Sequence, residues 1–361
     1  MNILFDINHP AHVHLLRNAY AMLTEKGNKV LVAVKEIPSA IRLLDLYGMP
    51  YLNIGKKADS VTKKGWNQLV YDRRLLRIVR EHHIDIGVGS SINLAHVSKM
   101  SKMKSIILDD DDDDVEPLFV KFGHPFADVI LTPSSIHRKS KRAVYVHAFH
   151  ELAYLHPNRF KPDPNVLSEV GVKEGETFFV LRFNAFKAHH DIGAEGLSLE
   201  YKRRLVDCLK AKGRVFITTE RDMEDDFKAY QLKISPDKIH SLMYYAFMMV
   251  GDSQTMTSEA AVLGTPAIKC NSFAGRLSVP NELEQKYGLC YSFLPGQIEA
   301  FFARIDELLA MPNIKSEWSR RRQKMLDEKM DYSRFLTWFI ENYPESCDIM
   351  REQPEYQSQF G

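Results

Sequence analysis

Short apolar segments alternate with longer segments of helical periodicity along most of this 361-residue chain. This alternation is typical of βαβ units, in which helices cover a parallel sheet. In the first half, strands are predicted at Ile3–Ile7, Val30–Val34, Tyr51–Ile54, Ile84–Gly89, Ser105–Leu108 and Val129–Thr132. Helices are predicted at Ala11–Lys26, Pro38–Tyr47, Lys64–His83 and Ala95–Lys102. The pattern predicts a doubly wound α/β domain.

A second α/β cycle follows a proline-containing segment, 156–175, that lacks periodicity and indicates a linker. Its strands are predicted at Thr177–Phe183, Val215–Thr219, Met248–Gly251 and Ala267–Cys270, and its helices at Leu199–Lys212, Met223–Tyr230, Thr255–Leu263 and Ser316–Tyr343. We therefore expect two tandem Rossmann-like domains, 1–160 and 161–325, with a ligand cleft between them at the carboxyl ends of their strands. Residues 326–361 form a C-terminal helix and tail, with packing back on the first domain as one option.

Composition narrows the class of protein. The 48 Lys and Arg residues balance 47 Asp and Glu residues, so no overall field attracts nucleic acid. No apolar run reaches the roughly 18 residues of a membrane span, and the amino end lacks a secretory signal. We expect a cytoplasmic protein with at most peripheral membrane contact. The basic stretches 56–64 and 99–104 are either solvated faces or sites for such contact. The four widely spaced cysteines indicate reduced thiols.

A strand, a short polar turn and a helix follow one another between Met248 and Gly264. Ser253 and Thr255 are good residues for a helix start, where free N–H groups and the helix dipole favour a diphosphate. Glu259, further along the helix, is suited to bind both hydroxyls of a ribose. The alternative is an ordinary strand–turn–helix unit in which Glu259 only benefits from the positive helix end.

The first strand leads into a histidine-rich helix start containing His9, His12 and His14. A metal site is disfavoured, because residues two apart do not share a helix face and no fourth ligand has suitable spacing. We predict His12 as a general base or phosphate partner, since an unperturbed histidine titrates near neutrality. A packed or capping role suits His14 better.

Two further polar segments follow predicted strands. The acidic run Asp109–Asp114, with Glu116 after it, is a solvated turn or helix cap, an Asp-x-Asp site for Mg²⁺ or Mn²⁺, or a source of catalytic acids. The metal site is disfavoured because it leaves the second α/β cycle unexplained. Arg182, at the end of a strand, can bind phosphate with two donors. The loop after it contains His189 and is either catalytic or simply exposed.

The segment MNILFDINHPAHVHLLRN resembles a family of GT-B-fold glycosyltransferases of unassigned reaction, and the resemblance covers nearly the whole chain. The segment from Asp252 to Pro266 is similar to the donor-binding segment of GT-B enzymes, including MurG-like transferases, and of non-hydrolysing UDP-N-acetylglucosamine 2-epimerases. Gln254 and Thr255 stand where those families have two glycines.

The resemblance implies a role for each site residue. Ser253, Thr255 and Arg182 would hold the diphosphate, Glu259 the ribose, and the segment around His240 the base. The epimerases keep catalytic acids and a histidine at positions that correspond approximately to Asp109, or Asp110, and to Glu116 and His189.

Three functions are open at this point. The first is a metal-independent GT-B glycosyltransferase that needs no cofactor and takes a UDP-sugar as donor. Its acceptor would be a glycan or a lipid-linked molecule in surface polysaccharide or glycoconjugate assembly. The second is a nucleotide-sugar 2-epimerase that uses Asp109, Glu116 and His189. The third is a nucleotide-sugar sensor without turnover.

Overall fold

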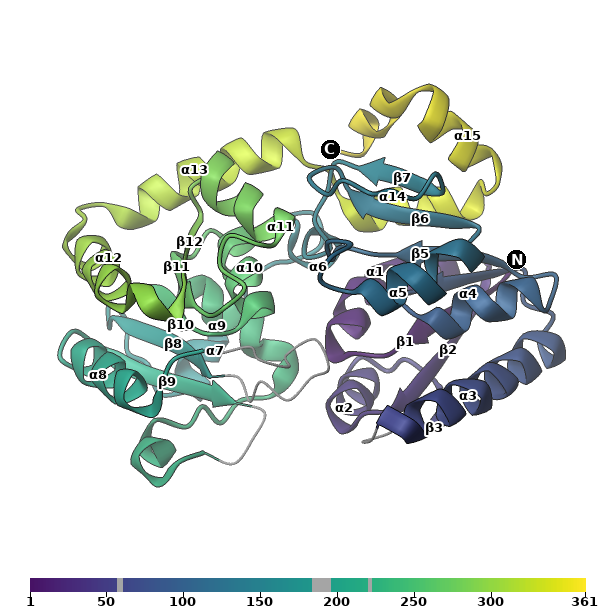
Figure 1. The fold of residues 1–361 in the computed structure, drawn as a ribbon. Coiled ribbons are helices and arrows are strands. Elements are labelled where there is room, and N and C mark those ends of the chain that lie inside the picture. The colour runs from purple at the N-terminus through teal and green to yellow at the C-terminus, as the bar shows by residue number, and fades with distance from the viewer. Residues whose placement is uncertain (57–60, 184–195, 220–222) are drawn as a thin grey trace. The chain divides into compact units, whose positions relative to one another are not determined.

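The computed structural model describes residues 1–56, 61–183, 196–219 and 223–361, and its chain divides into two compact units (Figure 1). Unit 1 consists of Met1–Arg159 together with Lys329–Gly361, and unit 2 consists of Phe160–Glu328. Each unit is built on one parallel sheet. The predicted α/β class with two Rossmann-like sheets is confirmed.

The sheet of unit 1 has the strand order β3-β2-β1-β4-β5-β6-β7. Its strands are β1 (Asn2–Ile7), β2 (Lys29–Glu36), β3 (Leu52–Lys56), β4 (Ile86–Gly89), β5 (Lys104–Leu108), β6 (Val129–Pro133) and β7 (Ala143–Val146). The order reverses between β1 and β4, and ligands of such sheets bind outside the strand ends at this switch point. Gly89, the last residue of β4, allows the close approach of β1, because a Cβ atom there would lie 2.6 Å from the Asp6 carbonyl oxygen.

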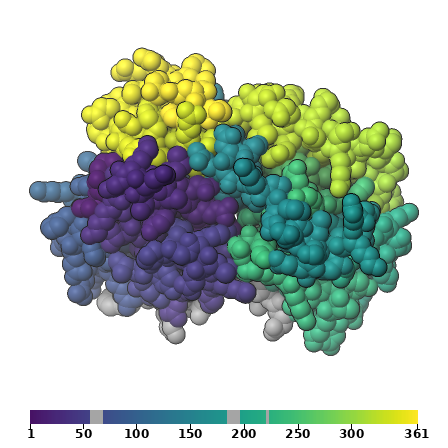
Figure 2. Space-filling model, turned by 180° about the vertical axis from the view of Figure 1, so that it is seen from behind, coloured from purple at the N-terminus to yellow at the C-terminus, as the bar shows by residue number. Residues whose placement is uncertain are grey.

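Helices cover both faces of this sheet. They are α1 (Pro10–Glu25), α2 (Pro38–Leu46), α3 (Val61–Glu81), α4 (Ile92–Lys99), α5 (Pro117–Phe122), α6 (Leu152–Leu155), α14 (Tyr332–Glu341) and α15 (Glu345–Glu352), with 3₁₀ turns η1 (His124–Phe126) and η7 (Pro354–Phe360). On one face, Leu75 of α3 and Leu94 of α4 pack with Leu4 and Ile107 of the sheet. The C-terminal segment packs on the N-terminal part, with α14 against α1 (Figure 2).

Unit 2 has a five-stranded sheet of order β12-β11-β10-β8-β9. Its strands are β8 (Phe178–Phe183), β9 (Arg214–Thr219), β10 (Met248–Gly251), β11 (Ala267–Cys270) and β12 (Cys290–Phe293). Its helices are α7 (Asn165–Glu169), α8 (Leu199–Lys210), α9 (Ile239–Tyr245), α10 (Gln254–Leu263), α11 (Ser278–Asn281), α12 (Ile298–Ala310) and α13 (Ile314–Glu328), with short turns η3 (Asp225–Tyr230), η4 (Pro236–Lys238), η5 (Glu282–Lys286) and η6 (Pro295–Gln297). The order reverses between β8 and β10, so their carboxyl ends form the switch point of this unit.

The structure differs from the predicted elements in four places. The predicted helix Ser316–Tyr343 is two helices, α13 and α14, separated by residues 329–331. Asp331 starts α14 as its N-cap, accepting a hydrogen bond from the Arg334 amide at 3.1 Å. The edge strands β7 and β12 were not predicted, and the predicted helix Met223–Tyr230 is the shorter 3₁₀ turn η3.

Candidate functional site

The amino end of α10 lies directly after β10, at the switch point of unit 2. Ser253 is its N-cap, and the Ser253 hydroxyl accepts a hydrogen bond from the Met256 amide at 3.4 Å. Thr255 in the first turn is exposed, so this helix end is accessible to a ligand. A Cβ atom at Gly251 would lie 2.0 Å from the Arg182 carbonyl oxygen, so only glycine allows β10 to approach β8 here. An open helix end of this kind favours an anion.

Glu259 is buried one turn further along α10. Its Oε1 lies 3.0 Å from Nε2 of His240 on α9, and the two side chains are 6% and 1% exposed. The ring of Phe160 contacts His240 edge-on. This pairing orients the Glu259 carboxylate, and the binding of a base by the segment around His240 stays a prediction.

A lysine that the sequence analysis did not single out reaches the same helix end. Lys269 on β11 is 1% exposed, and its Nζ donates a hydrogen bond to Oε1 of Gln254, the first residue of α10. Burial lowers the pKa of Lys269 to about 8, although Cys290 and Glu284 act in the opposite direction. No pattern could have revealed this residue, because it stands in an apolar strand segment, Ala267–Cys270, that reads as core.

The remaining predicted residues of unit 2 are placed as follows. Arg182 lies near the end of β8, where its Nη1 donates to Oγ1 of Thr218 at 3.3 Å. The side-chain amide of Asn271 donates to the Asp252 carbonyl at 2.9 Å and thereby fixes the turn before α10. His189 lies outside the described residues.

In unit 1, polar side chains gather after the switch-point strands β1 and β4. The buried carboxylate of Asp6 accepts hydrogen bonds from the Ser91 hydroxyl and, at 3.1 Å, from the side-chain amide of Asn8. Oδ1 of Asp6 and Oδ1 of Asn8 are buried without a hydrogen-bond partner among the described residues. Unsatisfied buried oxygens of this kind are rare and mark a candidate binding site.

His12 lies in the first turns of α1, where its Nδ1 accepts a hydrogen bond from the Asn8 amide at 3.4 Å. Burial, followed by the positive charges of His9 and His150, lowers its pKa to about 3 despite the opposing charge of Asp110. His12 is therefore neutral at physiological pH, which corrects the expectation that it titrates near neutrality. Because Nδ1 of His12 accepts a hydrogen bond, the proton of the neutral ring is on Nε2, which can donate it.

His14 has the packed role expected for it. Its ring stacks on Tyr154 at 5.4 Å between centroids, and its Nδ1 lies 3.1 Å from the Tyr47 hydroxyl.

Asp109, the first residue of the acidic run, is held in a buried network. Nε2 of His124 lies 2.7 Å from its Oδ2, and Arg138 lies 2.8 Å from its Oδ1. Arg138 also pairs with Asp113 at 2.8 Å. Both oxygens of Asp109 are engaged, so the geometry assigns this carboxylate to fixing the loop, and its predicted catalytic role stays a prediction.

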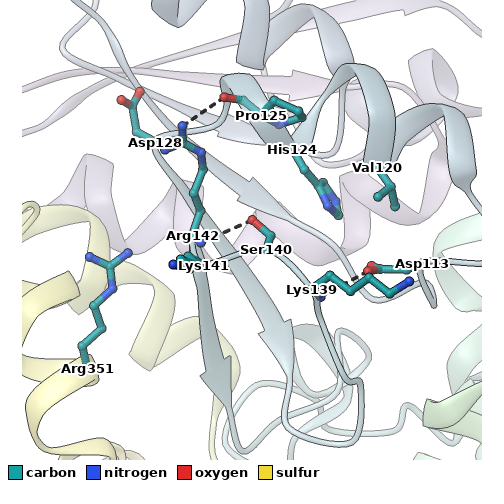
Figure 3. A pocket seen from close by; sticks show the side chains of 10 residues that line it. All are labelled: Asp113, Val120, His124, Pro125, Asp128, Lys139, Ser140, Lys141, Arg142 and Arg351. Atoms are coloured by element: carbon teal, nitrogen blue, oxygen red, sulfur yellow. Dashed lines mark hydrogen bonds between the residues drawn. The ribbon is translucent and has the colours of Figure 1, made fainter.

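Asp113 and His124 of this network also line a cavity of about 620 Å³ in unit 1. Its other walls carry the basic side chains of Lys139, Lys141, Arg142 and Arg351 (Figure 3). The guanidinium of Arg142 donates to the Pro125 carbonyl at 3.1 Å.

The next acid, Asp110, pairs with His150, which follows β7. Nδ1 of His150 lies 3.0 Å from Oδ2 of Asp110, and Nε2 of His150 is buried without a hydrogen-bond partner among the described residues. The His150 ring stacks on Tyr332 of α14, whose buried hydroxyl likewise lacks a partner in the described chain. A histidine held by a carboxylate at one nitrogen and free at the other has the geometry of a general base.

The charges in this cluster separate the pKa values of its members. Burial opposes ionisation of Asp110, but His150 outweighs it and lowers the pKa of Asp110. Burial likewise opposes protonation of His150, but Asp110, Glu151 and Asp109 raise its pKa above 6.5. Asp111 behaves differently: burial, followed by the charges of Asp110 and Glu116, raises its pKa well above the usual range. The charges in this cluster thus lower the pKa of Asp110 and raise the pKa values of His150 and Asp111.

Glu116 precedes α5 as its N-cap residue, without a side-chain hydrogen bond to the helix. Its effect on Asp111 places it beside this cluster. Within the residues that the structure describes, no group of three or more His, Cys, Asp or Glu side chains is arranged to hold a metal ion. No helix in the described ranges is long and apolar enough to cross a membrane.

Two Rossmann-like units, each with polar residues at its switch point, define the GT-B class of folds. Solved structures of this class are similar to the present chain. The S. aureus MnaA–UDP co-structure superposes with a TM-score of 0.68 at 10% identity, over 96% of this chain and 97% of that one. Spinosyn rhamnosyltransferase SpnG with spinosyn aglycone gives 0.64 at 11% identity, over 95% and 100%. A putative UDP-N-acetylglucosamine 2-epimerase from Listeria monocytogenes gives 0.65 at 9% identity, over 95% and 96%. The chain has the GT-B fold.

The chain belongs to the DUF354 family, described as "protein of unknown function", whose model matches residues 1–286. No curated protein matches the sequence.

Proposed function

We propose that this protein is a nucleotide-sugar-dependent glycosyltransferase whose unit 2 binds the donor at the amino end of α10. The observation that carries the proposal is this open helix end, placed at the switch point with Glu259 behind it. Ser253, Thr255 and Arg182 hold the diphosphate, and Glu259, oriented by His240, binds the ribose. Structural neighbours that contain UDP or thymidine diphosphate support a nucleoside diphosphate as the ligand.

The chemistry needs no metal, because preorganised amides and cations stabilise the departing diphosphate. Unit 1 supplies the proton acceptor. Nε2 of His150, backed by Asp110, takes the proton of an acceptor hydroxyl as its oxygen bonds to the anomeric carbon. The bond from that carbon to the diphosphate breaks, and the nucleoside diphosphate leaves with the bonding electrons. We propose UDP as the nucleotide and a glycan or lipid-linked acceptor in surface polysaccharide assembly.

A second function, epimerisation at C2 of UDP-N-acetylglucosamine, is favoured by one observation. The pKa of Asp111 is raised well above its usual range beside the Asp110–His150 pair, so one cluster offers a candidate acid and a candidate base. The two functions separate in one incubation: an epimerase interconverts UDP-N-acetylglucosamine and its 2-epimer with no acceptor present, whereas a transferase does not.

Donor binding is tested by thermal shift with UDP, thymidine diphosphate and guanosine diphosphate. A ligand present at 100 times its Kd adds about 2.7 kcal/mol of stability. We expect Glu259→Gln to lose most of this gain, because the amide cannot accept from both ribose hydroxyls. Glu299→Gln, which changes an exposed carboxylate of unit 2, should keep it. Absence of any shift for wild-type protein across the panel would overturn the proposed function.

A further inference from the structure

Lys269 is buried, and the part of the chain that the structure describes provides no counter-charge for it. Among the described residues, no carboxylate lies within ion-pair distance of its Nζ, and its hydrogen-bond partner is the neutral side chain of Gln254. The groups that face it from neighbouring elements are Cys290 on β12 and Glu284 on η5. Lysine is almost never fully buried unless it is paired, so this position calls for an explanation.

The location of Lys269 makes its burial still less favourable. Gln254 is the first residue of α10, and the amino end of a helix carries a positive partial charge of about half a unit. A cation placed there is repelled by the helix dipole as well as removed from water. Burial lowers its pKa to about 8. An anion at this helix end would neutralise both positive charges at once.

The side-chain amide of Gln254, next to Lys269, also indicates an anion as the ligand. Oε1 of Gln254 accepts a hydrogen bond from Nζ of Lys269, so the amide presents its nitrogen on the other side. That nitrogen, Nε2, is buried without a hydrogen-bond partner in the described part of the chain. Here a lysine and a glutamine add a charge and a donor.

We propose that Lys269 is the counter-charge for the diphosphate of the bound nucleotide, with the Gln254 amide as an additional donor. The inference rests on the proposed function and identifies residues by which this chain binds its phosphates. The same logic applies to any phosphate-bearing ligand that reaches this helix end, so inorganic pyrophosphate serves as a probe that lacks base and ribose.

Calorimetry of UDP binding at pH 8.5 tests the proposal. In the protein without ligand, Lys269 is mostly deprotonated at this pH. An anion that raises its pKa therefore causes uptake of about 0.7 proton on binding. Comparing the binding enthalpy in buffers of different ionisation enthalpy measures this uptake. We expect Lys269→Met to bind UDP and pyrophosphate roughly tenfold or more weakly and to lose this uptake. Uridine, which has no phosphate, should bind both proteins equally.

Two variants provide the controls. Lys329→Met removes another buried lysine, in unit 1, and should leave affinity and proton uptake unchanged. Gln254→Glu places a carboxylate beside Lys269, and we expect it to raise Tm and weaken UDP binding, because the new charge takes the place of the phosphate. This variant tests the proposal even if Lys269→Met fails to fold.

The outcomes separate the two proposals. If wild-type protein binds none of these nucleotides, the proposed function fails. If wild-type protein binds UDP while Lys269→Met retains its affinity and proton uptake, or Gln254→Glu leaves both Tm and affinity unchanged, the role of Lys269 is overturned and donor binding stands.

Discussion

Two histidines of unit 1 show how surroundings decide the role of a side chain. His12 and His150 belong to one electrostatic cluster around Asp110, yet the pKa of His12 falls to about 3 while that of His150 rises. Burial and the charges of His9 and His150 lower the pKa of His12, whereas the charge and hydrogen bond of Asp110 outweigh burial and raise the pKa of His150. His12 accepts from a backbone amide, whereas His150 donates to a carboxylate. The geometry thus favours His150 as the base, a residue that no motif of the sequence singled out.

The pH dependence of turnover tests this assignment. Asp110, Glu151 and Asp109 raise the pKa of His150 above 6.5, and His12 and Tyr332 also lie near the pair. Since only the neutral ring accepts a proton, we expect kcat/KM to rise with pH through this raised pKa. Asp110→Asn should move that limb to lower pH, because it removes the charge that stabilises the protonated ring. His150→Gln should lower kcat by roughly 10²–10⁴.

His12→Gln is the matched comparison. His12 stays neutral throughout the pH range of the assay, so its replacement should leave unchanged the pH at which kcat/KM rises. A limb that disappears in His12→Gln and persists in His150→Gln would reassign the base to His12.

At the scale of elements, the periodicity of apolar residues predicted those strands and helices whose positions depend on local sequence. The strands β1, β5 and β10 and the helix α10 lie where the apolar pattern placed them, because each buries a face of the expected period. The edge strand β7 was missed because it is short and follows a run of basic residues. The His124–Asp109–Arg138 network was also missed, since long-range pairing of polar residues leaves no local pattern.

The break between α13 and α14 depends on a single buried acid. Asp331 is fully buried, caps α14 and pairs with Nε of Arg159 at 2.7 Å. We expect Asp331→Ala to cost about 3 kcal/mol or more of unfolding free energy, because it leaves a partly buried guanidinium unpaired and removes a cap. Urea denaturation measures this loss. Asp207→Ala, which breaks an exposed pair with Lys210, should cost below about 0.5 kcal/mol.

At the scale of the whole molecule, unit 1 is made from two separate stretches of chain. Phe335, Leu336, Phe339 and Ile340 of α14 are completely buried, and α14 packs on α1. Lys26 pairs with Glu341 at 2.5 Å beside this contact.

We expect a chain that ends at residue 328 to lose the structure of unit 1 and keep that of unit 2. Hydrogen exchange reports the two units separately. In the shortened protein, amides of β1 and α1 should exchange rapidly, whereas those of β8 and β10 should stay protected. Equal protection of β1 in both proteins would show that residues 329–361 are dispensable for the first sheet.

The division of unit 1 into two segments also has a consequence for biosynthesis. Residues 160–328 leave the ribosome before residues 329–361 do, so unit 2 has all of its residues available while unit 1 still lacks α14. Domains generally fold as they emerge, the earlier ones first. Here the second unit along the chain is the first that can finish folding, and the α1 surface that packs on α14 stays uncovered until residues 332–341 have been synthesised.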